Sequence, residues 1–131
     1  MAVWLLKTEP QAYSIDQLKT EHTTIWDGIA NPMALKYLRA VCRGDELLIY
    51  HTGKEKAIVG FARANSDAAI RGGNPKDVVL EIEFVRKLQT PLKLSAIKAD
   101  ATFVGWELTR LPRLSVMPVP KAIAKRLAAM P

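Results

Sequence analysis

The sequence is short of the residues that build disulfides and metal sites. It has one cysteine, Cys42, among 131 residues, so no internal disulfide can form and a thiolate metal site would lack most of its ligands. Its two histidines, His22 and His51, stand too far apart for a metal-binding motif. We therefore predict no metal and no cofactor, and a fold held together by packing.

Long hydrophobic runs are also missing. No apolar run approaches the roughly 20 residues that cross a bilayer, and the short apolar stretch at residues 1–6 lacks the basic lead of a signal peptide. The 49% hydrophobic and 24% charged residues are typical of a globular protein. We expect a cytoplasmic protein with no membrane partner, folded as a single domain over residues 1–131.

The motifs of common catalytic sites are absent as well. The chain has no Gly-x-Ser-x-Gly nucleophile elbow and no Gly-x-x-x-x-Gly-Lys-Ser/Thr loop for phosphates. Gly72-Gly73 lacks the strand-to-helix setting of a dinucleotide-binding turn. We predict no catalytic residue and expect that the protein is not an enzyme.

Positive charge is concentrated in the last third of the chain. Residues 1–65 carry 8 basic and 7 acidic side chains, whereas residues 86–131 carry 9 basic and 2 acidic ones. An excess gathered in this way indicates an anionic partner, of which nucleic acid is the most common.

Short apolar runs and turn signals predict about five strands with short helices between them. The strands are expected at residues 3–6, 47–50, 58–61, 78–88 and 113–116. Gly60, inside the third of these, predicts a bulge or a close approach of two backbones. Because the strands cluster rather than alternate with helices, the pattern indicates an α+β fold with a mainly antiparallel, strongly curved sheet or small barrel.

Helix-capping signals mark where helices begin. Ser14 precedes Gln17 by three places, which predicts a short helix starting just after Ser14. Asn31 stands before a proline, the pattern of an N-cap followed by the first helical position. Ser95 predicts a one-turn helix, and residues 120–129 a terminal basic helix.

Recognition of a nucleobase needs a flat aromatic face, a few hydrogen-bonding side chains and nearby positive charge. Trp26 stands in a predicted loop between two helix starts, and Ser14 and Asn31 stand at helix N-termini. Each has an alternative role, since Trp26 can be ordinary core and both polar residues can simply cap their helices.

Taken in order, several blocks of the chain resemble the successive signatures of the EVE domain. They are Trp4-Leu5-Leu6-Lys7-Thr8-Glu9-Pro10, Tyr13-Ser14-Ile15-Asp16, Trp26-Asp27-Gly28, Gly44-Asp45, Ile49-Tyr50-His51-Thr52, Val59-Gly60 and Arg113-Leu114-Ser115-Val116-Met117-Pro118-Val119. The EVE domain belongs to the PUA-like superfamily, with the YTH, ASCH and SRA domains. The resemblance implies a curved barrel of five or six strands with helices packed around it, and a pocket for a modified nucleobase in DNA or RNA.

The resemblance also implies roles for individual residues. Trp26 would be the stacking wall, Ser14 and Asn31 would hydrogen-bond the base edge, and Lys7 and His51 would line the same pocket. Strand alternation allows either His51 or its neighbour Tyr50 to point inward, and we favour His51.

Arg113 and Ser115 lie near the pocket mouth in the family pattern. Arg113 is then a candidate for a phosphate contact, the alternative being a solvated basic face.

The chain departs from the common family pattern after Trp26-Asp27-Gly28. The family usually continues Val-Arg-Asn-Tyr-Gln-Ala-Arg, but here Ala30, Pro32, Met33 and Leu35 replace two arginines, a tyrosine and a glutamine. Losing two cations and two hydrogen-bonding side chains predicts a different modified base or a weaker grip on the backbone. The alternatives to a reader of nucleic acid are a sensor of a free modified nucleoside, or an enzyme acting on nucleic acid.

Overall fold

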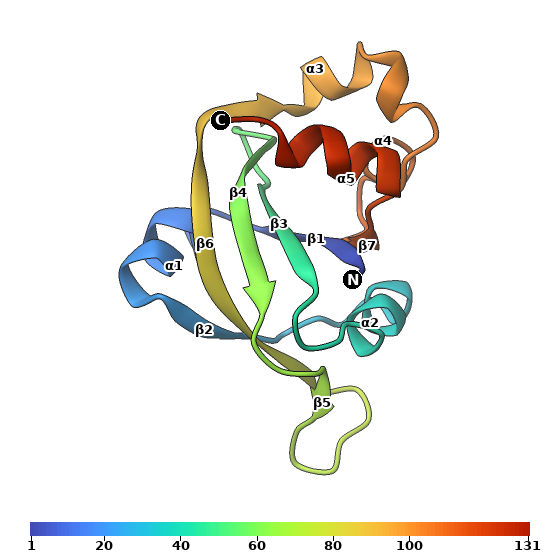
Figure 1. The fold of residues 1–131 in the computed structure, drawn as a ribbon. Helices are drawn as coiled ribbons and strands as arrows, with labels where there is room; N and C mark the ends of the chain where they lie inside the picture. The colour runs from blue at the N-terminus through green and yellow to red at the C-terminus, as the bar shows by residue number, and fades with distance from the viewer.

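Seven strands form one strongly curved sheet, with the helices around it (Figure 1). The computed structural model describes residues 1–131. The strands are β1 (Val3–Thr8), β2 (Thr23–Trp26), β3 (Glu46–His51), β4 (Ala57–Ala64), β5 (Ala69–Ile70), β6 (Val78–Lys93) and β7 (Val116–Pro118). The helices are α1 (Ile15–Glu21), α2 (Pro32–Arg39), α3 (Leu94–Lys98), α4 (Glu107–Arg110) and α5 (Lys121–Ala128), with a 3-10 turn, η1, at Ala101–Phe103.

The strand order is β2-β6-β4-β3-β1-β7, and β5 pairs with β6 beside this path. All pairs are antiparallel except β1 with β3, which run parallel. The predicted fold class is therefore confirmed: an α+β fold with a curved, mainly antiparallel sheet. The sheet has seven strands rather than five or six, and it stays open because its outer strands, β2 and β7, do not pair.

Local capping chemistry sets the first two helices as predicted. The Ser14 hydroxyl oxygen accepts from the backbone N–H of Gln17, and α1 begins at the next residue after Ser14. Asn31 caps α2, with Pro32 at the first helical position. The predicted cap at Ser95 was wrong: α3 begins one residue earlier, and Lys93 occupies the N-cap without a side-chain hydrogen bond.

Two strands differ from the prediction. Trp26 does not stand in a loop but ends β2, where it pairs with Leu80 of β6. This four-residue strand carries no long periodic signal, so only its pairing with β6 reveals it. The strand expected at residues 113–116 begins only at Val116, where it pairs with β1.

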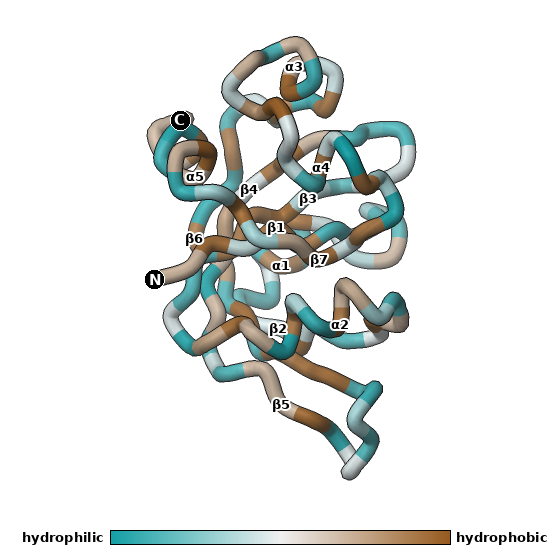
Figure 2. The backbone as a smooth tube through the Cα atoms, turned by 90° about the vertical axis from the view of Figure 1, so that its right-hand side faces the viewer, coloured by the Kyte–Doolittle hydropathy of each residue, from teal (hydrophilic) through white to brown (hydrophobic).

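The core consists of side chains from the central strands and the inner faces of the helices. Figure 2 shows hydrophobic residues gathered along the strands in the middle of the molecule. Asp45 is a rare buried charge within it, and its carboxylate accepts from the Trp4 indole N–H at 3.0 Å and the Cys42 backbone N–H at 2.9 Å. Asp45 thereby ties β1 to the turn before β3. None of the helices is long and apolar enough to span a bilayer.

Gly60 lies where β4 is squeezed between β6 and α1. The register of β4 shifts between Ile58 and Gly60, which confirms the predicted irregularity. A Cβ atom at this position would lie 2.8 Å from the Arg86 carbonyl oxygen and 2.9 Å from Ile15 Cδ1. The close approach lets α1 pack onto the sheet at this point.

We expect Gly60→Ala to lower the free energy of unfolding by about 1–3 kcal/mol, because the added methyl group must displace backbone or the buried side chain of α1. Urea unfolding followed by circular dichroism measures the change. A variant with the wild-type midpoint and slope would contradict the close packing of β4 under α1.

Candidate functional site

An open cavity of about 210 Å³ lies where β1 ends beside β2 and the segment that leads to α2. For scale, a cavity of about 150 Å³ in another protein accommodates benzene, so this one has room for a single planar ring. Its walls combine apolar and polar side chains: Lys7, Thr8, Tyr13, Thr24, Ile25, Trp26, Asp27 and Ile29. We call it the Trp26 cavity.

Trp26 is largely buried but keeps one polar group open. Its side chain is only 7% exposed, and its ring meets that of Tyr13 edge to face, at 6.1 Å between centroids and 88° between planes. The indole N–H groups of Trp4 and Trp106 donate within the protein, whereas that of Trp26 has no protein partner. No fully enclosed side-chain polar atom lacks a partner. The Trp26 N–H is therefore accessible and can donate to a molecule in the cavity.

Tyr13 is held against Trp26 from two sides. The Thr8 hydroxyl donates to the Tyr13 carbonyl oxygen at 2.8 Å, and the Tyr13 hydroxyl donates to the Glu21 carboxylate at 2.7 Å. Burial and the neighbouring Glu21 carboxylate raise the pKa of Tyr13. The phenol thus stays neutral near physiological pH and keeps its bond to Glu21.

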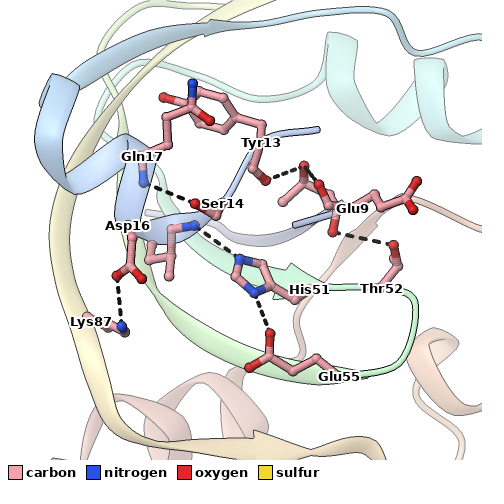
Figure 3. A network of polar contacts seen from close by, with 11 residues as sticks. Glu9, Tyr13, Ser14, Asp16, Gln17, His51, Thr52, Glu55 and Lys87 are labelled. Carbon is pink, nitrogen blue, oxygen red and sulfur yellow. Dashed lines mark hydrogen bonds and ion pairs between the residues drawn. The ribbon is translucent and has the colours of Figure 1, made fainter. Parts of the chain in front are cut away.

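His51 fixes the start of α1 rather than lining the cavity. Its Nε2 accepts from the Ile15 backbone N–H at 3.0 Å, and its Nδ1 lies 2.6 Å from the Glu55 carboxylate (Figure 3). Because Nε2 accepts, the ring proton sits on Nδ1, where it can donate to Glu55. Both ring nitrogens are occupied, so none is free for a bound base.

The strand alternation is the reverse of the one we favoured from the sequence. In the parallel register of β1 and β3, Lys7 lies opposite Tyr50. The Lys7 ammonium is 5.4 Å from the centroid of the Tyr50 ring, whereas His51 turns toward α1. Tyr50, and not His51, is therefore the β3 side chain beside Lys7.

Lys7 extends across the edge of the Trp26 cavity. Its ammonium donates to the Pro112 carbonyl oxygen at 3.0 Å, which leaves two N–H groups free. Its backbone N–H donates to the Ser115 carbonyl oxygen at 2.9 Å, so Ser115 lies next to β1 at this edge. Burial lowers the pKa of Lys7.

Ser14 and Asn31 act as helix caps and do not line the Trp26 cavity. The Ser14 oxygen accepts from Gln17, and the Asn31 side-chain oxygen accepts from the backbone N–H groups of Met33 and Ala34. Capping uses only their acceptor oxygens. The Ser14 hydroxyl proton and the Asn31 amide N–H groups remain able to donate.

Arg113 lies beside Asn31 in a second hollow. This space of about 310 Å³ is also bordered by Met33 and by residues 111–114. Arg113 is exposed and takes part in no ion pair of the structure. Its guanidinium is therefore free to meet an anion.

Three cavity residues were missed in the sequence analysis. Tyr13 and Asp27 stand within motifs that mark the family, next to residues we singled out, so they could have been found there. Thr24 belongs to the unpredicted strand β2 and carries no such signal. Asp27 also pairs with Arg71 at 3.1 Å, which links the cavity rim to the loop between β5 and β6.

Comparison with known proteins gives consistent matches. The family model described as "EVE domain" matches residues 2–130. Thymocyte nuclear protein 1 from Gallus gallus is 32% identical over 72% of this chain and 51% of its own length. The chain spans about half the length of the curated relatives it matches.

Solved structures share the fold over nearly the full chain. Rpa0253 from Rhodopseudomonas palustris is 33% identical with a TM-score of 0.89, covering 96% of this chain and 90% of its own. The human THYN1 protein, solved in complex with DNA containing 5-methylcytosine, is 25% identical with a TM-score of 0.86, covering 97% and 96%.

We expect His51→Ala to lower the free energy of unfolding by about 1–3 kcal/mol, because the buried Ile15 N–H loses its acceptor. Thermal and urea unfolding measure this loss. Glu55→Gln is the matched control, since its amide oxygen can still accept from Nδ1 while the ring keeps its bond to Ile15. Equal stability of His51→Ala and Glu55→Gln would contradict the positioning role of His51.

Proposed function

Because the chain belongs to the EVE domain family, we propose that it is a non-catalytic module that recognises a modified nucleobase in DNA or RNA. The base swings out of its strand and enters the Trp26 cavity, and residues 1–131 act as one domain. The observation that carries this proposal is an open cavity with a tryptophan wall and an unpartnered indole N–H.

The walls of the Trp26 cavity suit a planar ring with polar edges. Trp26, Tyr13 and Ile29 offer apolar surface, while Lys7 and Asp27 supply a cation and a carboxylate at the rim. A base such as cytosine presents both acceptors and an exocyclic amino donor. Lys7 and the Trp26 N–H would meet its acceptors, and Asp27 would accept from its amino group.

The human relative bound to DNA with 5-methylcytosine makes that base the first one to test. Stacking on an aromatic side chain contributes roughly 1–3 kcal/mol, which offsets an unstacking cost of a few kcal/mol. A buried methyl group adds about 0.8 kcal/mol. One apolar notch, such as the surface of Ile25 or Ile29, is enough for a modest preference.

The remaining predicted residues have supporting roles in this proposal. Ser14 and Asn31 contribute the donors that capping leaves free, and Arg113 contacts a phosphate, with Ser115 beside it at the mouth. His51 acts indirectly, by fixing the start of α1.

A free modified nucleoside is the second candidate. The first turn of α2 carries no charged side chain, since its charged residues, Lys36 and Arg39, stand in the last turn. The rim at this helix therefore offers no cation to a nucleic-acid backbone. Equal affinity for the nucleoside and for an oligonucleotide containing it would favour this candidate.

We expect Trp26→Phe to weaken binding of a short oligonucleotide containing 5-methylcytosine by about five- to tenfold, because the N–H and part of the stacking surface are lost. Fluorescence anisotropy of the labelled oligonucleotide measures the affinity. Trp26→Ala is a poor test, since truncating so buried an indole costs about 3–5 kcal/mol of stability.

Trp106→Phe is the matched control. Its indole is buried and donates to the Pro118 carbonyl oxygen, away from the Trp26 cavity. It should lose stability and keep its affinity. Unchanged affinity in Trp26→Phe, or an equal loss in both variants, would remove the Trp26 cavity from the binding account.

A further inference from the structure

A second hollow lies on the other side of Lys7 from the Trp26 cavity. It encloses about 330 Å³ and is bordered by Lys7, Tyr50, Thr52, Lys56, Lys98 and Thr109, among others. We call it the Tyr50 hollow. Lys7 borders both spaces, so a molecule in one lies next to a molecule in the other.

The charge around the Tyr50 hollow is of one sign. Lys7, Lys56 and Lys98 border it, no carboxylate does, and none of the three lysines takes part in an ion pair. An adjoining space adds Lys54 and one acid, Glu55, whose carboxylate is already bound to His51. Cations gathered without counter-charges favour an anion between them.

The Tyr50 side chain supplies a buried donor in this hollow. It is only 3% exposed, yet its hydroxyl has no hydrogen-bond partner in the protein. Because no fully enclosed side-chain polar atom is left unpaired, this hydroxyl opens into the hollow. Burial raises the pKa of Tyr50, so the phenol keeps its proton and can donate it to an anionic oxygen.

The backbone holds Lys56 and Lys98 at the same hollow. Lys56 has a φ of 44°, a left-handed conformation that is uncommon for a residue with a side chain. Its carbonyl oxygen accepts from the Leu94 backbone N–H at 2.8 Å. This bond joins the turn between β3 and β4 to α3, the helix that ends at Lys98.

We propose that the Tyr50 hollow binds a phosphate group, held by the ammonium groups of Lys7, Lys56 and Lys98 and by the Tyr50 hydroxyl. Assigning this phosphate to the nucleic acid whose base occupies the Trp26 cavity rests on the proposed function. The phosphate site itself does not. Lys7 then contacts base and phosphate at once, and the hollow supplies backbone contacts that α2 lacks.

Inorganic phosphate alone is the first probe, titrated at constant ionic strength and followed by NMR of the lysine ammonium and tyrosine ring signals. We expect saturable shifts at Lys7, Tyr50, Lys56 and Lys98. Tyr50→Phe removes only the hydroxyl and should weaken phosphate binding about tenfold. Tyr13→Phe, whose hydroxyl is bonded to Glu21, is the matched control and should leave it unchanged.

A charge-matched pair of double variants provides the second arm. Lys56→Gln with Lys98→Gln should abolish saturation by phosphate, whereas Lys121→Gln with Lys125→Gln removes two exposed charges from α5 and should not. Shifts that do not saturate, that spread equally over all lysines, or that survive the first double variant would overturn the phosphate site.

The source of the phosphate follows from three further probes: 5-methyl-2′-deoxycytidine, its 5′-monophosphate and an oligonucleotide containing it. If the phosphate belongs to a nucleic-acid backbone, the first double variant should weaken the oligonucleotide most and flatten its salt dependence, by about 0.7 log units per lost contact on a single strand. A gain confined to the monophosphate would assign the hollow to a free nucleotide. Phosphate binding without any preference for the modified base would sink the proposed function and leave the phosphate site standing.

Discussion

A single buried hydrogen bond, from the Ile15 backbone N–H to the His51 ring, determines where the Trp26 cavity can form. It joins the start of α1 to the end of β3, while Glu55 sets the tautomer of the ring. The segment just before α1 carries Tyr13, which packs on Trp26. If α1 began elsewhere, Tyr13 would leave the indole and the cavity would lose one wall. His51 therefore acts on binding through the position of a backbone.

Two side chains serve both the fold and the binding surface. Trp26 ends β2 and packs against the core, yet its indole N–H remains open. Lys7 belongs to β1, the strand that joins β3 to β7, yet its ammonium separates the Trp26 cavity from the Tyr50 hollow. The close fit of base and phosphate spaces around Lys7 follows from the parallel register that sets it opposite Tyr50.

The sequence predicted features that depend on neighbouring residues and failed on those that depend on distant ones. The caps at Ser14 and Asn31 and the constraint at Gly60 follow from local chemistry, and all three are present. The strand that ends at Trp26 exists only because β6 pairs with it, and the inward position of Tyr50 follows from a pairing with β1. No short-range pattern carries that information. The residues quoted for the EVE resemblance located Lys7 and Trp26 correctly at one cavity, whereas the capping roles of Ser14 and Asn31 and the bonds of His51 required the structure.

The most direct test of base recognition is fluorine NMR of the protein with 5-fluorotryptophan in place of its three tryptophans, Trp4, Trp26 and Trp106. Our account predicts that an oligonucleotide containing 5-methylcytosine shifts the Trp26 signal in a saturable way, leaves the other two in place, and does so at lower concentration than the unmethylated oligonucleotide. Binding of either oligonucleotide with the Trp26 signal unmoved would contradict it.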